Sequence, residues 1–158
     1  MIIGEPMSCK TQSLRVLAEA LTSLSEQGIG GPENKTTFKI INPKSITMSQ
    51  LYGSFDPSTH EWADGVLGRT FRDMATSSSD ERKWLVFDGP VDSAWIENLN
   101  TVLDESRKLC LMNGEIIPLS NNMTLFFEMS DLKKASPAVV GRTSIVYMES
   151  HLLGNKNP

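Results

Sequence analysis

The hydrophobic residues along the chain alternate between two spacings, one typical of helices and one typical of buried strands. Apolar residues recur every three or four positions from Lys10 to about Gln27, which predicts an amphipathic helix. Gly28 is well placed to end that helix. A continuous apolar run, Trp84 to Phe87, lies between Lys83 and Asp88 and indicates a strand buried on both faces.

The same criteria predict the remaining elements. They place strands at 1–3, 37–41, 123–127 and 144–147, and helices at 64–75, 93–105 and 131–135. Asn113 and Gly114 lie between two apolar runs in 108–119, which predicts a β-hairpin with a two-residue type I′ turn. Alternation of strands and helices predicts an α/β fold with a mostly parallel sheet flanked by helices. We expect one core over residues 1–150, with loops at 28–37 and 76–80 and a disordered tail at 151–158.

Composition and charge narrow the class of protein. The chain has 158 residues, 39% of them hydrophobic and 22% charged, as in ordinary globular domains. A net charge of -4 argues against a nucleic-acid partner, which would need a basic surface. No apolar run approaches the roughly 20 residues of a membrane helix, so we expect no membrane partner. Cys9 and Cys110 lack metal-ligand spacing, and a reducing cytoplasm is the default expectation.

The first predicted strand leads into GEPMSCKT (4–11), which fits the phosphate-binding loop G-x-x-x-x-G-K-[ST] with one change. Gly4, Lys10 and Thr11 match, and Cys9 stands where the second glycine is expected. In such a loop Lys10 would neutralise phosphate charge, and the Thr11 hydroxyl would bind Mg²⁺. The backbone that would wrap the phosphates runs through Gly4, Glu5, Pro6, Met7, Ser8 and Cys9. The alternative is an ordinary strand-to-helix turn.

Cys9 is the weak point of this match. Glycine lets the backbone approach phosphate and adopt unusual dihedral angles at little cost. If this position requires a positive φ, cysteine adds strain of roughly 1–2 kcal/mol. Such strain would loosen the loop without abolishing it.

A second motif, KWLVFDG (83–89), supports the nucleotide hypothesis. An aspartate at a strand tip, here Asp88, is used by P-loop NTPases to hold Mg²⁺ beside the loop hydroxyl. A glutamate that polarises water usually follows in ATPases of the AAA+ kind, but Gly89 has no side chain and cannot act as a base. Asp92 is better placed to cap the next helix. The sequence therefore predicts binding of ATP or ADP with Mg²⁺, and no catalytic residue for hydrolysis.

Three further motifs identify a specific family. FDGPVD (87–92) followed by WIEN (95–98), LCLMNGE (109–115) and SPAVVGR (136–142) resemble the second AAA+ module of a dynein heavy chain of the axonemal type. The resemblance runs from Ile2 to about Glu149. It implies a P-loop NTPase fold with a hairpin insert. The second of the six modules in a microtubule-motor ring is thought to hold ATP without turning it over.

The resemblance also implies partners, a location and two more site residues. The partners would be neighbouring AAA+ modules, with intermediate chains, light chains and microtubules contacted through the full-length protein. The location would be the cytoplasm and cytoskeleton, in the axoneme of a cilium or flagellum. Glu128 lies where AAA+ proteins keep a polar sensor of the γ-phosphate; a surface acid at a strand end is an equal alternative. Arg142 matches the arginine lent to the neighbouring module's nucleotide. Its alternatives are a surface arginine or a salt bridge within the domain.

The chain departs from the family pattern in two ways. Family members commonly keep glycine at the position of Cys9. Only Met1 to Ile3 precede Gly4, and no helical small subdomain follows Tyr147, so we expect an excised or truncated core. Three hypotheses follow: a nucleotide-binding module that does not hydrolyse, an active ATPase with another base such as Glu128, and a vestigial domain that binds nothing.

Overall fold

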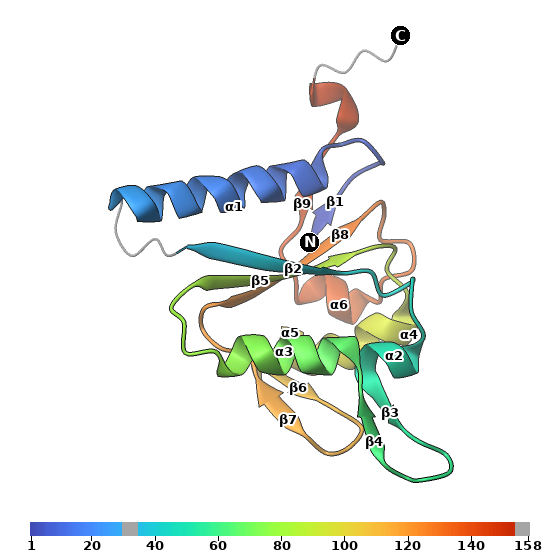
Figure 1. The fold of residues 1–158 in the computed structure, drawn as a ribbon. Helices are drawn as coiled ribbons and strands as arrows, with labels where there is room; N and C mark the ends of the chain where they lie inside the picture. The colour runs from blue at the N-terminus through green and yellow to red at the C-terminus, as the bar shows by residue number, and fades with distance from the viewer. Residues whose placement is uncertain (30–34, 154–158) are drawn as a thin grey trace.

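A parallel sheet of five strands forms the centre of the molecule (Figure 1). The computed structural model describes residues 1–29 and 35–153. Across the sheet the strand order is β2-β5-β8-β1-β9, and each pair of neighbours is parallel. The strands are β1 (Ile2–Ile3), β2 (Thr36–Ile41), β5 (Arg82–Asp88), β8 (Met123–Met129) and β9 (Val146–Tyr147). The predicted α/β fold is confirmed.

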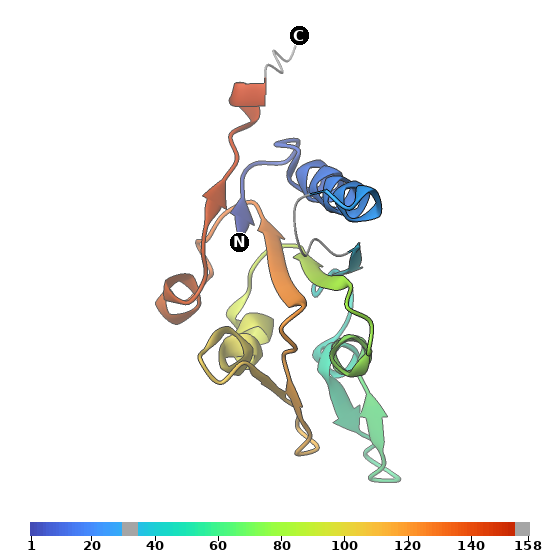
Figure 2. The ribbon, with the colours of Figure 1, turned by 90° about the vertical axis from the view of Figure 1, so that its left-hand side faces the viewer.

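Helices cover the two faces of the sheet unequally. α1 (Lys10–Gln27) lies along one face, and its end at Gly28, where φ is 63°, agrees with the prediction. The other face carries α2 (Met48–Tyr52), α3 (Val66–Thr76), α4 (Ser93–Ile96), α5 (Asn100–Leu103) and α6 (Pro137–Gly141), as Figures 1 and 2 show. In the described part of the chain, no helix has both the length and the apolar content needed to cross a membrane.

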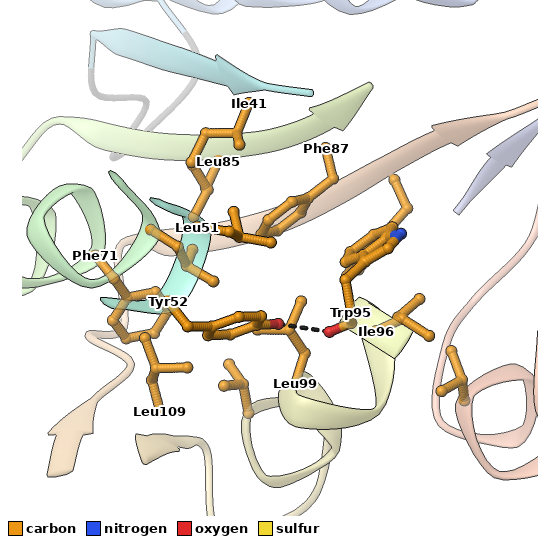
Figure 3. Packing of buried hydrophobic residues seen from close by; sticks show 14 of the residues in the cluster. Ile41, Leu51, Tyr52, Phe71, Leu85, Phe87, Trp95, Ile96, Leu99 and Leu109 are labelled. Carbon is orange, nitrogen blue, oxygen red and sulfur yellow. Dashed lines mark hydrogen bonds between the residues drawn. The ribbon is translucent and has the colours of Figure 1, made fainter. Parts of the chain in front are cut away.

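The larger hydrophobic core lies on the face opposite α1 (Figure 3). Phe87 of β5 stacks on Trp95 of α4, with ring centroids 5.5 Å apart, and on Phe127 of β8, at 5.1 Å. The Tyr52 hydroxyl donates to the Trp95 carbonyl oxygen at 2.5 Å, and burial raises the pKa of this tyrosine. Burying aromatic rings of this size contributes roughly 2–3 kcal/mol each, which holds the second helical layer against the sheet.

A smaller core lies between α1 and the sheet. Its members alternate with those of the larger core along the strands, as expected for strands buried on both faces. They are Ile2, Leu14, Ala18, Trp84 and Val86. Trp84 and Trp95 are both buried, and they pack on opposite faces of the sheet. The face that a strand residue occupies is therefore known for every position of β5 and β8.

Two hairpins extend from the helical side (Figure 1). They are β3 (Gly53–Phe55) with β4 (Trp62–Asp64), and β6 (Lys108–Cys110) with β7 (Ile116–Pro118). The second hairpin was predicted, but its type I′ turn is wrong. Within 111–115 only Gly114 has a positive φ, and its N–H donates to the Leu111 carbonyl while the Leu111 N–H donates to the Glu115 carbonyl. The loop therefore has three residues, with glycine at the left-handed position.

Two predicted helices need correction. The helix expected at 93–105 is broken by a 3-10 turn, Glu97–Leu99, and ends at Leu103. Asparagine and threonine in this stretch compete with helical hydrogen bonding, which favours short, tight turns. No helix forms at 131–135. The helix there begins instead after Ser136, whose side chain accepts from the Val139 N–H, with Pro137 in the first turn.

Between 44 and 64 the chain forms α2, β3 and β4, none of which was predicted. Thr47 and Gln50 form a capping box that starts α2, a signal present in the spacing T-x-x-Q. Asp64 belongs to β4, so the helix expected from that residue begins at Val66. The hairpin loop is ordered by Asp56, which accepts bonds from Ser58 and Thr59 that lower its pKa to about 2.

The predicted loop and tail are described only in part. Residues 30–34 of the predicted loop at 28–37 lie outside the described residues. A short 3-10 helix, Ser150–Leu153, follows β9, and the remainder of the expected tail, 154–158, also lies outside them.

Candidate functional site

The segment from Gly4 to Cys9 joins β1 to α1 at the carboxyl edge of the sheet. Its first residue is held by the Gly4 N–H, which donates to the Met129 carbonyl oxygen at 3.1 Å. A Cβ atom at Gly4 would lie 2.1 Å from the Met148 carbonyl oxygen and 2.7 Å from Ser8 Oγ. Only glycine fits between these groups, so Gly4 sets the path of the loop.

Two side-chain-bearing residues of this loop have left-handed backbone conformations. Cys9, the residue before the first turn of α1, has φ 57°, and Met7 has φ 67°. The Cys9 side chain makes no capping hydrogen bond to the helix. The condition set out above for strain at Cys9 is therefore met, and the position is one that glycine would occupy at lower cost.

Lys10 closes over the loop from the start of α1. Its Nζ donates to the carbonyl oxygens of Gly4 at 2.7 Å and Glu5 at 2.9 Å, and to Ser8 Oγ at 3.2 Å. Ser8 is fully buried, so this hydroxyl is part of the floor of the loop. The ammonium group thus lies above the loop backbone. An anion bound there would contact both this group and the N–H groups at the N-terminus of α1.

A hollow of about 310 Å³ lies over this loop. Of the residues predicted for the site, Met7 to Thr11 line it, whereas Gly4, Glu5, Pro6, Asp88 and Glu128 do not. Gln12 and Arg15, which were not predicted, also line it. Arg15 follows Thr11 by four positions, and residues at that spacing share a helix face. Helical periodicity from Thr11 was therefore the signal that could have found it.

Thr11 contacts a buried acid on β8. Its hydroxyl donates to Glu128 Oε2 at 2.5 Å, and Glu128 is only 2% exposed. The second oxygen, Oε1, is buried without a hydrogen-bond partner. The alternative of a surface acid is therefore wrong. It assumed a strand ending at Phe127, whereas β8 continues to Met129 and carries Glu128 inside the sheet.

Asp88 and Glu128 lie side by side on the face that α1 covers. The sheet register pairs Asp88 with Glu128 and Glu128 with Ile2. Ile2 packs against α1, and paired residues of a parallel sheet project to the same face. Burial raises the pKa of the Glu128 carboxyl, and the neighbouring Asp88 charge raises it further. The fold thus brings Thr11, Glu128 and Asp88 together from three separate elements.

Gly89 follows Asp88 in a conformation that side chains rarely adopt. Its φ is 154°, and a Cβ atom there would lie 3.1 Å from Asn42 Oδ1. Its N–H donates to the Glu128 carbonyl oxygen, which keeps the strand end in place. The position therefore lacks a general base, and its surroundings disfavour one. Asp92 caps α4 by accepting from the Ala94 N–H, as predicted.

Arg142 lies at the end of α6, away from the loop hollow. Its guanidinium donates to the Ala138 carbonyl oxygen at 3.3 Å and lies 3.8 Å from Asp104 Oδ2. The salt bridge within the domain, one of the alternatives considered for this residue, is present. Both partners remain partly exposed, so the pair is weak and open to exchange.

The residues at the loop suit a phosphate ligand with a divalent cation. Lysine, loop N–H groups and a helix start supply positive charge, while a hydroxyl and two carboxylates suit Mg²⁺. Within the described residues no group of three or more His, Cys, Asp or Glu side chains could hold a metal ion. A cation here would therefore depend partly on ligand oxygens, as Mg²⁺ bound with a nucleotide does.

A parallel sheet with this loop after β1, and with acids at the ends of β8 and of the next strand, β5, defines a P-loop nucleotide-binding fold. Residues 1–143 match the family described as AAA domain (dynein-related subfamily). The chain belongs to that family. It is 54% identical over 154 residues to human dynein axonemal heavy chain 12, 57% over 156 residues to mouse dynein axonemal heavy chain 3, and 51% over 156 residues to human dynein axonemal heavy chain 1.

These alignments cover 98–99% of the chain but only 4–5% of each relative. The resemblance to axonemal dynein heavy chains is thus confirmed for the family.

Proposed function

We propose that this chain is a module of a dynein heavy chain that binds Mg-ATP and holds it without hydrolysis. One observation carries this proposal. Lys10 and Thr11 start α1 beside the paired acids Asp88 and Glu128, and the residue after Asp88 is a glycine. The site combines the groups that bind a triphosphate with the lack of the usual base.

The residues of the chain would act as follows. The N–H groups of Met7 and Cys9, together with those at the start of α1, would contact phosphate oxygens, and Lys10 would exchange its carbonyl partners for them. Thr11 and Asp88 would hold Mg²⁺, which neutralises phosphate charge when bound. Glu128, whose Oε1 has no partner, would receive a polar contact from the ligand side.

The site lacks a side chain positioned to activate water. Gly89 cannot accept a proton, and Asn42 crowds the space where a longer side chain would begin. Glu128 is the other acid at the site, but it is buried and already bonded to Thr11. A base must reach the attacking water, and the Glu128 oxygen that Thr11 leaves without a partner, Oε1, is buried away from solvent.

The larger assembly is also part of the proposal. The chain would be the second AAA+ module of the ring, contacting neighbouring modules and, through the full heavy chain, intermediate chains, light chains and microtubules in the axoneme. Arg142 would serve the neighbour's nucleotide after leaving Asp104, which its exposure permits. The identity to axonemal heavy chains supports a place in such a motor.

The test is recovery of nucleotide after incubation with Mg-ATP. We expect bound nucleotide to be recovered as ATP from the wild type and to be absent from Lys10→Ala. Phosphate release that Glu128→Gln abolishes would instead favour the active ATPase. An empty wild type whose Cys9→Gly variant binds ATP would identify a vestigial loop, with the cysteine as its cause.

A further inference from the structure

Glu128 is a buried carboxyl near the carboxyl end of β8, in a place where an acid costs stability. Its side chain is 2% exposed, and among the described residues Oε1 has no hydrogen-bond partner. A buried carboxyl is unfavourable unless both of its oxygens find partners. A contribution of Glu128 to the neighbouring site would explain why an acid occupies this position.

The other oxygen, Oε2, fixes the direction of the Thr11 hydroxyl. The Thr11 O–H donates to Oε2 at 2.5 Å, which is short for a hydroxyl and a carboxyl oxygen. A hydroxyl has one hydrogen and two lone pairs, so the lone pairs of Thr11 are directed away from Glu128. A cation binds the lone pairs of a hydroxyl. The bond to Glu128 therefore orients Thr11 as a cation ligand.

The main chain of Glu128 holds the second residue proposed to bind the cation. Asp88 is its partner in the register of β5 and β8. The next residue, Gly89, donates its N–H to the Glu128 carbonyl oxygen at 3.1 Å. Asp88 is exposed, whereas Glu128 is buried. The side chain and the main chain of one residue thus position both groups proposed to hold Mg²⁺.

Glu128 itself does not line the hollow over the loop. Thr11 does, and it also contacts Glu128. An ionised carboxyl offers only acceptor oxygens, as a phosphate does, so the two groups have no hydrogen to share. The geometry therefore favours an action of Glu128 on a nucleotide through Thr11 and the cation.

We propose that Glu128 is a positioning residue for the cation, which it serves by orienting the Thr11 hydroxyl as a ligand. This inference rests on the proposed Mg-ATP site and names the residue that makes ATP binding depend on Mg²⁺. Residues that orient metal ligands from behind typically change metal affinity by about 10–100-fold when they are replaced.

The test measures ATP affinity by calorimetry in Mg²⁺ and in EDTA, for the wild type, Glu128→Met and Glu128→Gln. Both substitutions remove the charge, but only glutamine keeps an oxygen that accepts from Thr11. We expect the gain in affinity from Mg²⁺ to be at least about tenfold smaller in Glu128→Met than in the wild type. Glu128→Gln should keep most of the gain, and the two variants should bind ATP alike in EDTA.

Two controls separate positioning from other roles. In a Thr11→Val background, Glu128→Met should cause no further loss, because the hydroxyl that it orients is already absent. Urea denaturation should show Glu128→Met to be at least as stable as the wild type, since it removes a buried oxygen that has no partner.

Three outcomes would overturn the inference and leave the proposed function standing. They are a wild-type gain from Mg²⁺ in Glu128→Met, equal losses in both variants, and a further loss in the Thr11→Val background. A Glu128→Met chain that loses both stability and the Mg²⁺ gain would also overturn it, because Glu128 would then act through the fold. A wild type that binds no ATP in either condition would overturn the proposed function and this inference together.

Discussion

At the scale of single residues, the loop and the strand end beside it contain positions where backbone conformation decides what the side chain can be. Gly4 is confined by the Met148 carbonyl, and Gly89 has a positive φ beside Asn42. Cys9 has a left-handed backbone but carries a side chain. The site therefore has one residue whose conformation and identity disagree, and it is the residue that replaces the expected glycine.

Replacing Cys9 by glycine should stabilise the chain. Glycine adopts φ near 57° without the steric cost that a Cβ atom brings, so the free energy of unfolding should rise by about 1 kcal/mol. Urea denaturation measures this difference. Cys9→Ala is the matched control, because it removes the thiol and keeps the Cβ atom. A similar gain in both variants would show that the backbone at Cys9 is not strained.

Replacing Gly89 by alanine should do the reverse. The φ of 154° and the approach to Asn42 Oδ1 predict a loss of about 1 kcal/mol or more in the free energy of unfolding. Gly141→Ala is the control, since a Cβ atom there meets nothing within 4 Å and lies in α6. It should be neutral or slightly stabilising. A tolerated Gly89→Ala would leave room for a catalytic glutamate and weaken the argument against hydrolysis.

At the scale of elements, one arginine ties the two hairpins to α3. Arg72 contacts Asp64 of β4 at 2.9 Å and binds Glu115 of the β6–β7 loop through Nε and Nη2 at 2.7 and 2.6 Å. These bonds hold the pKa of both carboxyls below their usual range. The three side chains are about one-third exposed, so solvent screens part of the attraction. Although solvent weakens these ion pairs, Arg72 holds the two hairpins in position relative to each other.

This network should make stability depend on pH in the acid range. Because folding lowers both pKa values, the stabilisation is complete above the unfolded values near 4 and is lost as pH falls through the folded ones. Arg72→Met should cost about 1–2 kcal/mol at neutral pH and progressively less below pH 4. Urea titrations at several pH values test this, with exposed Lys39→Met as control. A cost that does not change with pH would show that packing, not charge, holds the hairpins.

How far sequence could predict these features depends on how local they are. Lys10 and Thr11 follow from spacing along one loop and helix, and Asp88 from one apolar run. The contact between Thr11 and Glu128 forms because β1 pairs with β8. That pairing joins residues more than a hundred positions apart, so no local pattern in the sequence predicts it. The three-residue loop at Gly114 and the broken helix after Ser93 depended on competition among local hydrogen bonds that periodicity does not reveal.

At the scale of the whole molecule, strand order makes the site. Because β8 lies between β1 and β5, the carboxyl ends of these three strands bring the loop, Glu128 and Asp88 to one edge, where Thr11 at the start of α1 contacts Glu128. Asp88 and Glu128 cannot be placed together by any single element. The account therefore predicts a triphosphate site that forms only in the folded sheet, with its cation next to the paired acids.

Calorimetric titration of the chain with ATP, with and without Mg²⁺, tests this most directly. We predict saturable binding of Mg-ATP that weakens at least about tenfold without Mg²⁺ or in Lys10→Ala, and that is unchanged in the exposed control Lys39→Ala. The recovered nucleotide should remain ATP. Absence of binding, equal binding in Lys10→Ala, or conversion to ADP during the titration would contradict the account.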